Sequence, residues 1–359
     1  MTVPLIIYDR DVDLVVAGAG IIGRAVAYEC ARRGFRVRVF DARRLRAGAT
    51  HASAGVLAPF IEAPAPGPLH SLTLQSFGLY DSFVAGVVTD AGMDVEFRRC
   101  GTLEVASNAA DAERLKSVAE WARGAGVDAE WRPAESFGSA LRAPTEFGGL
   151  LILRQGYVRV EQLMEALRRA AERYGAVFHE EEPIERINPR RGGVLVHYGG
   201  RSVTCEAVVV AAGSWSDSIA PDRVAVRPVR GQLLKLHWRA EPLPHVIWSE
   251  DCYVVPWVDG SVLVGATIED VGFDARVTAN GVRLLLDAVC RLLPDAADAT
   301  FLEARCGLRP ASSDGLPVIR SSRRSPRVIY ATGHYRNGIL LAPLTSQLVA
   351  DLLKVTVTE

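Results

Sequence analysis

Residues 18–23, near the start of the chain, read GAGIIG. An apolar segment precedes this turn over residues 11–17, and residues 21–33 carry small and apolar side chains suited to a helix. Residues 36–40 then alternate between apolar and charged side chains, as a second strand does. Since the glycines leave one strand and open a helix that leads to another strand, the sequence predicts a parallel βαβ unit.

Each glycine of this turn has a separate physical task. Gly18 permits the tight turn, Gly20 lets the backbone approach a pyrophosphate, and Gly23 allows the helix to pack closely on the strand. The helix begins at Ile21 and Ile22, where free N–H groups and a partial positive charge favour phosphate. The pattern therefore predicts a dinucleotide site, and a glycine-rich turn without a ligand is the alternative.

An acidic residue, Asp41, ends the second strand and is followed by Ala42 and Arg43. Its carboxylate can accept hydrogen bonds from the adenosine ribose hydroxyls. A carboxylate at this place disfavours the 2′-phosphate of NADP, but the turn alone does not choose between NAD and FAD.

The composition excludes several classes of protein. The chain has 359 residues, 49% of them hydrophobic, and a formal net charge of -1, so it can bury large cores and offers no basic field for nucleic acid. Apolar runs look too short and interrupted to span a bilayer, and residues 1–13 do not resemble a signal peptide. The six cysteines include no C-x-x-C pair and the histidines show no metal-ligand spacing, so we expect a cytoplasmic protein with no metal site.

Helical and strand patterns alternate along the rest of the chain. They predict an α/β fold in which two domains are interleaved in sequence: a Rossmann-like, FAD-binding domain and a domain built on an antiparallel sheet plus helices. The expected FAD-binding segments are residues 1–84, 150–225 and 304–359, and the expected substrate-binding segments are residues 85–149 and 226–303. Within them we expect a strand pair at 93–107, helices at 112–126, 160–175 and 281–293, and strands at 231–238, 252–260 and 261–267.

Small residues are dense between Gly48 and Pro59, in the sequence GATHASAGVLAP. Such a stretch lets the backbone approach a large flat group and leaves N–H groups and hydroxyls free to bind it. An ordinary flexible loop is an equal alternative from composition alone.

Six motifs in order resemble the D-amino-acid oxidase/glycine oxidase family of FAD enzymes, and bacterial glycine oxidases of the thiamine-biosynthesis type above all. They are GAGIIG with Asp41, ATHASAG, VVVAAGSWSD, PVRGQ, GLRPASSDGLPVI and GHYRNGILLAP. The resemblance implies the two-domain fold and an FAD site. The residues it assigns to FAD, together with those of the turn above, are Gly18, Gly20, Ile21, Ile22, Gly23, Asp41, Ala42, Arg43, Thr50, His51, Ala52, Ser53, Ala54, Gly55, Ile184, Ala212, Gly213, Trp215, Arg309, His334, Arg336, Asn337, Gly338, Ile339 and Leu340.

Oxidation of an amino acid needs a carboxylate clamp, for which planar, always charged arginine is the best side chain. By resemblance Arg309 is that clamp, and Tyr253 reaches the same carboxylate, with a core tyrosine as the alternative. The resemblance places Ile268 beside the substrate side chain. It places Asp251 near the mouth, where an acid could favour the substrate ammonium or disfavour a second carboxylate on the substrate.

The closing stretch GHYRNGILLAP predicts a buried helix that begins near Gly338 and points its N-terminus at the flavin. Free N–H groups between Asn337 and Leu340 would stabilise negative charge there. Arg336 is expected to face the substrate, with a cap-region ion pair as the alternative. His334 is expected to contact the flavin or pack beside it, without a role in proton transfer.

The resemblance implies FAD-dependent oxidation of glycine, sarcosine or small D-amino acids to a 2-oxo acid, ammonia or an amine, and hydrogen peroxide, with oxygen as acceptor. FAD is expected to be non-covalent, because Gly307 stands where some relatives carry a linking cysteine; a linkage through Cys306 is a minor alternative. A homo-oligomer is expected by resemblance. Two other functions stay open: a dehydrogenase of the same fold that reduces a quinone or protein, and an NAD-binding or non-catalytic flavin-binding protein.

Overall fold

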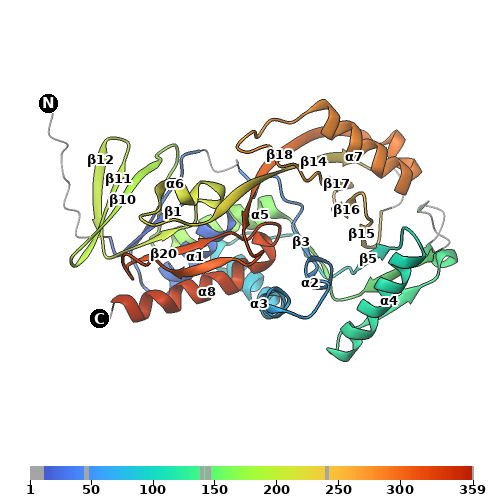
Figure 1. Cartoon of the computed structure of the whole chain (residues 1–359), viewed down its shortest axis with the longest axis horizontal. Coiled ribbons are helices and arrows are strands. Elements are labelled where there is room, and N and C mark those ends of the chain that lie inside the picture. Colours follow the sequence, from blue (N-terminus) through green and yellow to red (C-terminus); the bar gives the residue numbers. More distant parts are fainter. Residues whose placement is uncertain (1–11, 44–47, 138–140, 142–146, 239–241, 358–359) are drawn as a thin grey trace.

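A computed structural model describes residues 12–43, 48–137, 141, 147–238 and 242–357 of the chain (Figure 1). The short extension expected before the first strand lies mostly outside these residues. Figure 1 shows an elongated molecule in which a parallel sheet with its helices lies toward one end and a second, larger sheet lies toward the other.

Six strands form the first sheet, in the order β19-β20-β13-β1-β2-β9. All neighbours are parallel except β19, which pairs antiparallel with β20. The bounds are β1 Leu14–Ala17, β2 Val37–Phe40, β9 Val177–His179, β13 Ala207–Val210, β19 Val318–Ser321 and β20 Val328–Thr332. The expected βαβ unit is confirmed, because β1 and β2 are paired parallel strands and helix α1 (Ile21–Arg32) connects them in the sequence.

Helices cover one face of this sheet and a small sheet covers the other. Helix α1 packs against α5 (Val160–Arg173) and α8 (Gly338–Val357), and α3 (Pro68–Ala91) packs against both of these helices. The opposite face carries β10 (Ile184–Arg190), β11 (Gly193–Tyr198) and β12 (Arg201–Cys205), whose apolar side chains share a core with the sheet. The α/β class expected from the sequence is therefore confirmed.

The second sheet has eight strands, in the order β18-β14-β17-β16-β15-β5-β7-β6, and is antiparallel except between β15 and β5. Its bounds are β5 Thr102–Val105, β6 Ala129–Arg132, β7 Gly149–Ile152, β14 Val226–His237, β15 Val246–Trp248, β16 Tyr253–Pro256, β17 Ser261–Gly265 and β18 Thr300–Ser312. Helix α7 (Ala279–Leu292) packs on the β14–β17 part of the sheet, and α4 (Ala109–Gly124) packs on β6 and β7.

The strand pair expected at residues 93–107 is wrong, because its two strands enter different sheets. Strand β4 (Phe97–Arg98) pairs with β8 (Gly156–Val158), which also pairs with β3 (Val56–Leu57). Strand β5 pairs with β7 and β15 instead. The reason is burial, since Leu103 and Val105 of β5 pack in the core of the eight-stranded sheet while Phe97 packs against the core under α1.

Two elements run through the expected domain boundaries. Position 84/85 falls inside α3, and position 303/304 falls inside β18, which pairs with β14 along almost its whole length. The division into two domains stays a prediction. The remaining short elements among the described residues are α2 Pro59–Glu62, α6 Ser216–Ile219 and 3₁₀ turns at Ala134–Phe137, Gly213–Trp215 and Pro294–Asp298.

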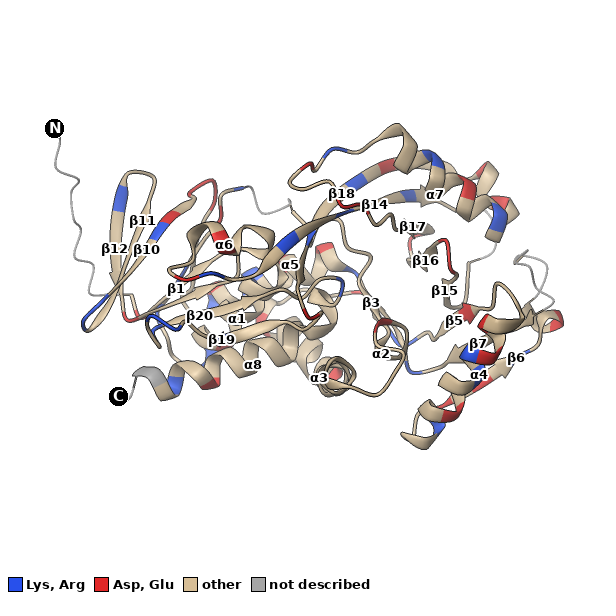
Figure 2. Ribbon diagram, viewed as in Figure 1, with Lys and Arg blue, Asp and Glu red and all other residues tan. Residues whose placement is uncertain are grey.

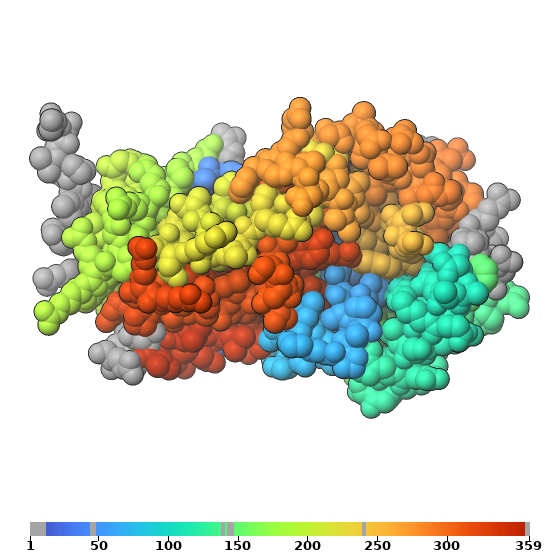
Figure 3. Space-filling model, viewed as in Figure 1, coloured from blue at the N-terminus to red at the C-terminus, as the bar shows by residue number. Residues whose placement is uncertain are grey.

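Helix α8 corrects the expectation that no apolar run is long enough to span a bilayer. Its residues Gly338–Val355 pass that test by length and composition, and Figure 2 shows the helix almost without charge except near its end. However, 61% of this window is buried against α1, α3 and the six-stranded sheet, as the core helix of a folded domain is. In the space-filling view its red surface lies directly beside the blue segment that contains α3 (Figure 3).

Candidate active site

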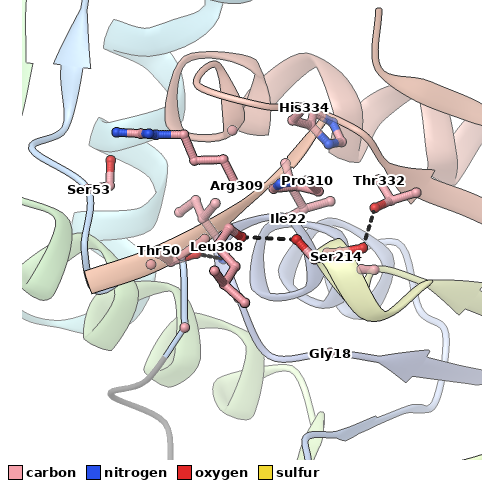
Figure 4. A pocket seen from close by; sticks show the side chains of 18 of the residues that line it. Gly18, Ile22, Thr50, Ser53, Ser214, Leu308, Arg309, Pro310, Thr332 and His334 are labelled. Atoms are coloured by element: carbon pink, nitrogen blue, oxygen red, sulfur yellow. Dashed lines mark hydrogen bonds between the residues drawn. The ribbon is translucent and has the colours of Figure 1, made fainter. Parts of the chain in front are cut away.

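A cavity of about 480 Å³ lies where the two sheets meet, between the carboxyl ends of β1 and β13 and the middle of β18 (Figure 4). It brings together most of the residues that the sequence assigns to cofactor and substrate. Those in its wall are Gly18, Gly20, Ile21, Ile22, Asp41, Ala42, Arg43, Thr50, Ala52, Ser53, Ala54, Gly55, Ile184, Ala212, Gly213, Trp215, Tyr253, Arg309, His334, Arg336, Gly338 and Ile339. The expected site residues outside the wall are Gly23, His51, Asp251, Ile268, Asn337 and Leu340.

The glycine-rich turn needs its glycines for backbone reasons. Gly18 has φ +109°, and a Cβ there would overlap the carbonyl oxygen of Ala211. A Cβ at Gly23 would overlap the carbonyl oxygen of Gly18, so this residue acts through packing of α1 on the turn and not through the cavity wall. Helix α1 starts after Gly20, which has no side chain to cap it, and the first residues of the helix line the cavity.

Two side chains fix the backbone around the turn. The Asp41 carboxylate accepts hydrogen bonds from the backbone N–H of Ala19 at 2.7 Å and of Arg43 at 2.9 Å. The Thr50 hydroxyl accepts one from the N–H of Ile21 at 3.1 Å, so it ties the small-residue stretch to the start of α1. These bonds leave carboxylate lone pairs at Asp41 that ribose hydroxyls can use.

The small-residue stretch 48–55 lies against β18. A Cβ at Gly307 would come within 2.8 Å of the Ala49 Cα and 2.9 Å of the Ala52 Cβ, so only glycine allows this contact. Beneath it, the buried Arg305 donates to the backbone carbonyl of His51 at 3.2 Å. Cys306 is not in the cavity wall, and burial raises the pKa of its thiol.

The cavity fits the expected FAD. One end has the open α1 terminus and the Asp41 carboxylate, which suit a pyrophosphate and a ribose. The other end has the small-residue stretch, which gives a flat wall, and beyond it the arginines. Within the described part of the chain no three His, Cys, Asp or Glu side chains gather as a metal site.

Arg309 projects from β18 into the cavity, where Figure 4 shows its guanidinium turned away from the glycine turn. Its Nη1 donates to the carbonyl oxygen of Thr267 at 2.9 Å, and a Cβ at Gly231 would overlap the guanidinium. Burial lowers the pKa of Arg309, but an arginine stays a cation near neutral pH. The side chain is therefore a fixed, partly buried positive charge whose remaining N–H groups face the cavity.

Tyr253 and Trp248 form a second part of this wall. The two rings stack at 4.8 Å between centroids, and the Tyr253 hydroxyl lies over Gly265, where a Cβ would overlap it. Burial raises the pKa of Tyr253, so the hydroxyl keeps its proton and can donate a hydrogen bond. Trp248 is absent from the sequence predictions, although it precedes Tyr253 by only five residues.

Arg336 lies on the same side of the cavity and forms an ion pair with Glu62. An ion pair was the alternative expected for Arg336, but Glu62 was not predicted as the partner. Its Nε and Nη2 are each 3.2 Å from a Glu62 carboxylate oxygen, and its guanidinium lies 5.3 Å from the Trp248 ring centroid. Glu62 ends α2, and the signal in the sequence is a lone acid within the apolar run GVLAPFIEAP.

Asp251 and Ile268 correct two expectations about the pocket. Asp251 is exposed at the surface and pairs with Arg291 of α7 at 2.9 Å. Ile268 is 60% exposed, because the chain leaves the sheet after β17 and turns this side chain outward. The acid of the pocket is thus Glu62 and not Asp251.

His334 lies in the wall just before α8, and its Nε2 is 3.0 Å from the Thr345 hydroxyl. Burial lowers its pKa to about 3, so the imidazole is neutral near pH 7. Gly338 and Ile339 at the start of α8 also line the cavity, so the N-terminus of this buried helix faces it.

Comparison with known proteins gives the same answer as the site. A family model described as FAD dependent oxidoreductase matches residues 13–352. The glycine oxidase of Geobacillus kaustophilus is 32% identical over 349 residues, 95% of this chain and 93% of the relative. The bifunctional protein ThiO/ThiG of a Nostoc species is 33% identical over 353 residues, but this chain spans only 52% of that longer protein.

Solved structures agree. The crystal structure of the Geobacillus kaustophilus glycine oxidase has a TM-score of 0.90 and 31% identity, and covers 96% of this chain and 95% of its own. Iminodiacetate oxidase from Chelativorans sp. BNC1 has a TM-score of 0.85 and 26% identity, with 95% of each chain covered. The chain therefore belongs to the family of FAD-dependent oxidoreductases that includes the glycine oxidases, and FAD is its cofactor.

Proposed function

We propose that this enzyme oxidises the Cα–N bond of glycine, sarcosine or a small D-amino acid. The observation that carries the proposal is Arg309, a partly buried cation in the cavity wall that is held by neutral carbonyl groups. The glycine oxidases among the relatives support the same class of substrate. The large rings of Trp248 and Tyr253 line the cavity on this side, which favours a small amino acid.

When bound, FAD would supply the acceptor for a hydride from the substrate and a route for the electrons to oxygen, which would become hydrogen peroxide. Arg309 binds the substrate carboxylate through its free N–H groups, and Tyr253 donates its O–H to the same carboxylate. His334 stays neutral and takes no proton near pH 7. The substrate reacts as the free amine, whose lone pair forms the imine; water then gives the 2-oxo acid and ammonia or an amine.

The cysteines support a proposal for the cellular compartment of the enzyme. All six lie in the described residues and are free, which suits the reducing cytoplasm. A homo-oligomer stays a prediction.

The test is peroxide release from glycine, sarcosine, D-alanine and D-proline and their L-counterparts, together with anaerobic reduction and reoxidation by air. We expect peroxide from at least one small substrate. Reduction by substrate with slow reoxidation in air would favour the dehydrogenase alternative, and no reduction by any substrate would contradict the proposal.

The Arg309→Ala variant tests the clamp. We expect it to keep FAD and its yellow colour but to lose on the order of 10²–10³-fold in kcat/KM, since a buried charged contact is lost. Arg227→Ala is the control, because Arg227 pairs with Asp270 at the surface. Loss of flavin from Arg309→Ala would make Arg309 a cofactor residue instead.

A further inference from the structure

Glu62 is an acid inside a pocket built to bind an acid. It ends the short helix α2, and the buried Phe60 of that helix anchors it. Its side chain is only 11% exposed and faces Arg336 in a two-point ion pair, at 3.2 Å for each nitrogen–oxygen contact. A carboxylate that is this well buried needs a reason beyond solubility.

The two arginines at the substrate end of the cavity, Arg309 and Arg336, are held differently. Among the described residues, Arg309 hydrogen-bonds to carbonyl oxygens and to no carboxylate. Arg336 faces the Glu62 carboxylate and the Trp248 ring. The nearby Glu62 charge raises the pKa of Arg336 although burial works against it. In the part of the chain that the structure describes, two arginines and one glutamate line the substrate end, which gives it a formal charge of +1, enough for one substrate carboxylate.

We propose that Glu62 makes this pocket selective for substrates that carry a single anionic group. Because Arg336 is paired with Glu62, it is not available to bind a second carboxylate or a phosphonate on the substrate. Its own charge also repels such a group. The inference rests on the proposed function, because it names the class of amino acid that the same site accepts: monocarboxylates, with dicarboxylates and phosphono amino acids excluded.

The size of the effect follows from electrostatics. At an effective dielectric constant near 20, one unit charge changes the binding constant of another charged group by roughly a hundredfold at about 6 Å and by roughly tenfold at about 12 Å. We therefore expect Glu62→Gln, which keeps the shape and removes the charge, to improve diacid binding relative to monoacid binding by at least about tenfold.

The first experiment measures binding without turnover. Acetate and malonate are titrated into the oxidised holoenzyme, and the change in the flavin absorption spectrum gives a Kd for each. We expect the ratio of the malonate Kd to the acetate Kd to fall at least about tenfold in Glu62→Gln. Glu62→Asp, which keeps the charge, should retain most of the wild-type ratio.

The second experiment measures selectivity in turnover. Iminodiacetate is sarcosine with a second carboxylate, so the ratio of kcat/KM for iminodiacetate to that for sarcosine should rise in Glu62→Gln by a similar factor. The matched control is Asp251→Asn, which removes one negative charge outside the cavity and should leave the ratio unchanged.

Two results would overturn the inference. One is an equal loss of kcat/KM for sarcosine and iminodiacetate in Glu62→Gln, which would make Glu62 a binder of the substrate ammonium. The other is an unchanged ratio in a variant that keeps its FAD. If Glu62→Gln loses FAD, Arg336→Gln is used, since it leaves the Glu62 charge unopposed and should raise the malonate-to-acetate Kd ratio; no rise would overturn the inference.

Failure of the proposed function is a different outcome. It appears as a wild-type enzyme that no small amino acid reduces, while the acid-binding experiment, which needs no turnover, still decides the role of Glu62.

Discussion

The cofactor end and the substrate end of the cavity reach their structures by different routes. The cofactor end is local, since Gly18, Asp41 and Thr50 lie within one βαβ unit and the loop that follows it, and the contacts run to backbone groups. The substrate end is assembled from four distant segments, and the ion pair between Glu62 and Arg336 alone joins residues 274 positions apart. The first end therefore depends on backbone conformation and the second on the placement of charged side chains.

The largest effect is expected at the cofactor end, for Gly23→Ala. The new Cβ would overlap the carbonyl oxygen of Gly18, and backbone on both sides prevents a small adjustment. We expect loss of most bound FAD and a fall of about 3 kcal/mol or more in the free energy of unfolding, as for other overpacked core positions. Flavin content after purification and urea unfolding measure the two effects.

Gly34→Ala is the matched control. Gly34 follows α1 with φ +96°, but nothing lies within 4 Å of a Cβ there. It should cost roughly 1–2 kcal/mol of backbone strain and leave FAD bound. If Gly23→Ala and Gly34→Ala lost the same amount of flavin, the overlap at Gly23 would have no special effect. That result would contradict the packing argument.

This contrast explains what the sequence could predict. The conformation of the GAGIIG turn and its strands is determined by the local sequence. The cofactor residues of this turn and the parallel sheet could therefore be predicted. Arg309 and Arg336 were named only through resemblance to a family. Tertiary packing decides whether a side chain enters the pocket: Glu62 does so because α2 folds back beside Arg336, while Ile268 turns outward as its loop leaves the sheet. No local pattern carries that information.

An intermediate effect is expected for Thr50→Val. The change removes the hydroxyl that accepts the Ile21 N–H at 3.1 Å, so the loop 48–55 loses its tie to the start of α1. One hydrogen bond contributes about 1 kcal/mol, so FAD should bind about fivefold to tenfold more weakly. The fluorescence of FAD released during a thermal ramp reports this as a lower release temperature.

Thr50→Ser keeps the hydroxyl and should release FAD close to the wild-type temperature. A serine variant as weak as the valine variant would assign the effect to the lost methyl group and its packing.

The smallest effect is expected at the substrate end, where Glu269 supports the clamp. Glu269 accepts hydrogen bonds from Arg230 at 2.6 Å and from Gln232 and the Thr267 hydroxyl at 2.7 Å, and the Thr267 and Arg230 carbonyls accept from Arg309. Burial acts to raise the pKa of Glu269, but these hydrogen bonds outweigh it and lower the pKa from 4.5 to about 2.

A carboxylate with a lowered pKa stabilises the fold above about pH 4.5, and this stabilisation is lost as the pH falls toward 2. Glu269→Gln removes it, so the difference in urea midpoint between wild type and variant should be constant near pH 7 and shrink progressively between pH 4.5 and 2. Because Glu269 is partly exposed, added salt should also reduce the difference. A difference that stayed the same down to pH 2 would mean that Glu269 acts through shape and not through charge, and Arg309 would then be oriented by packing alone.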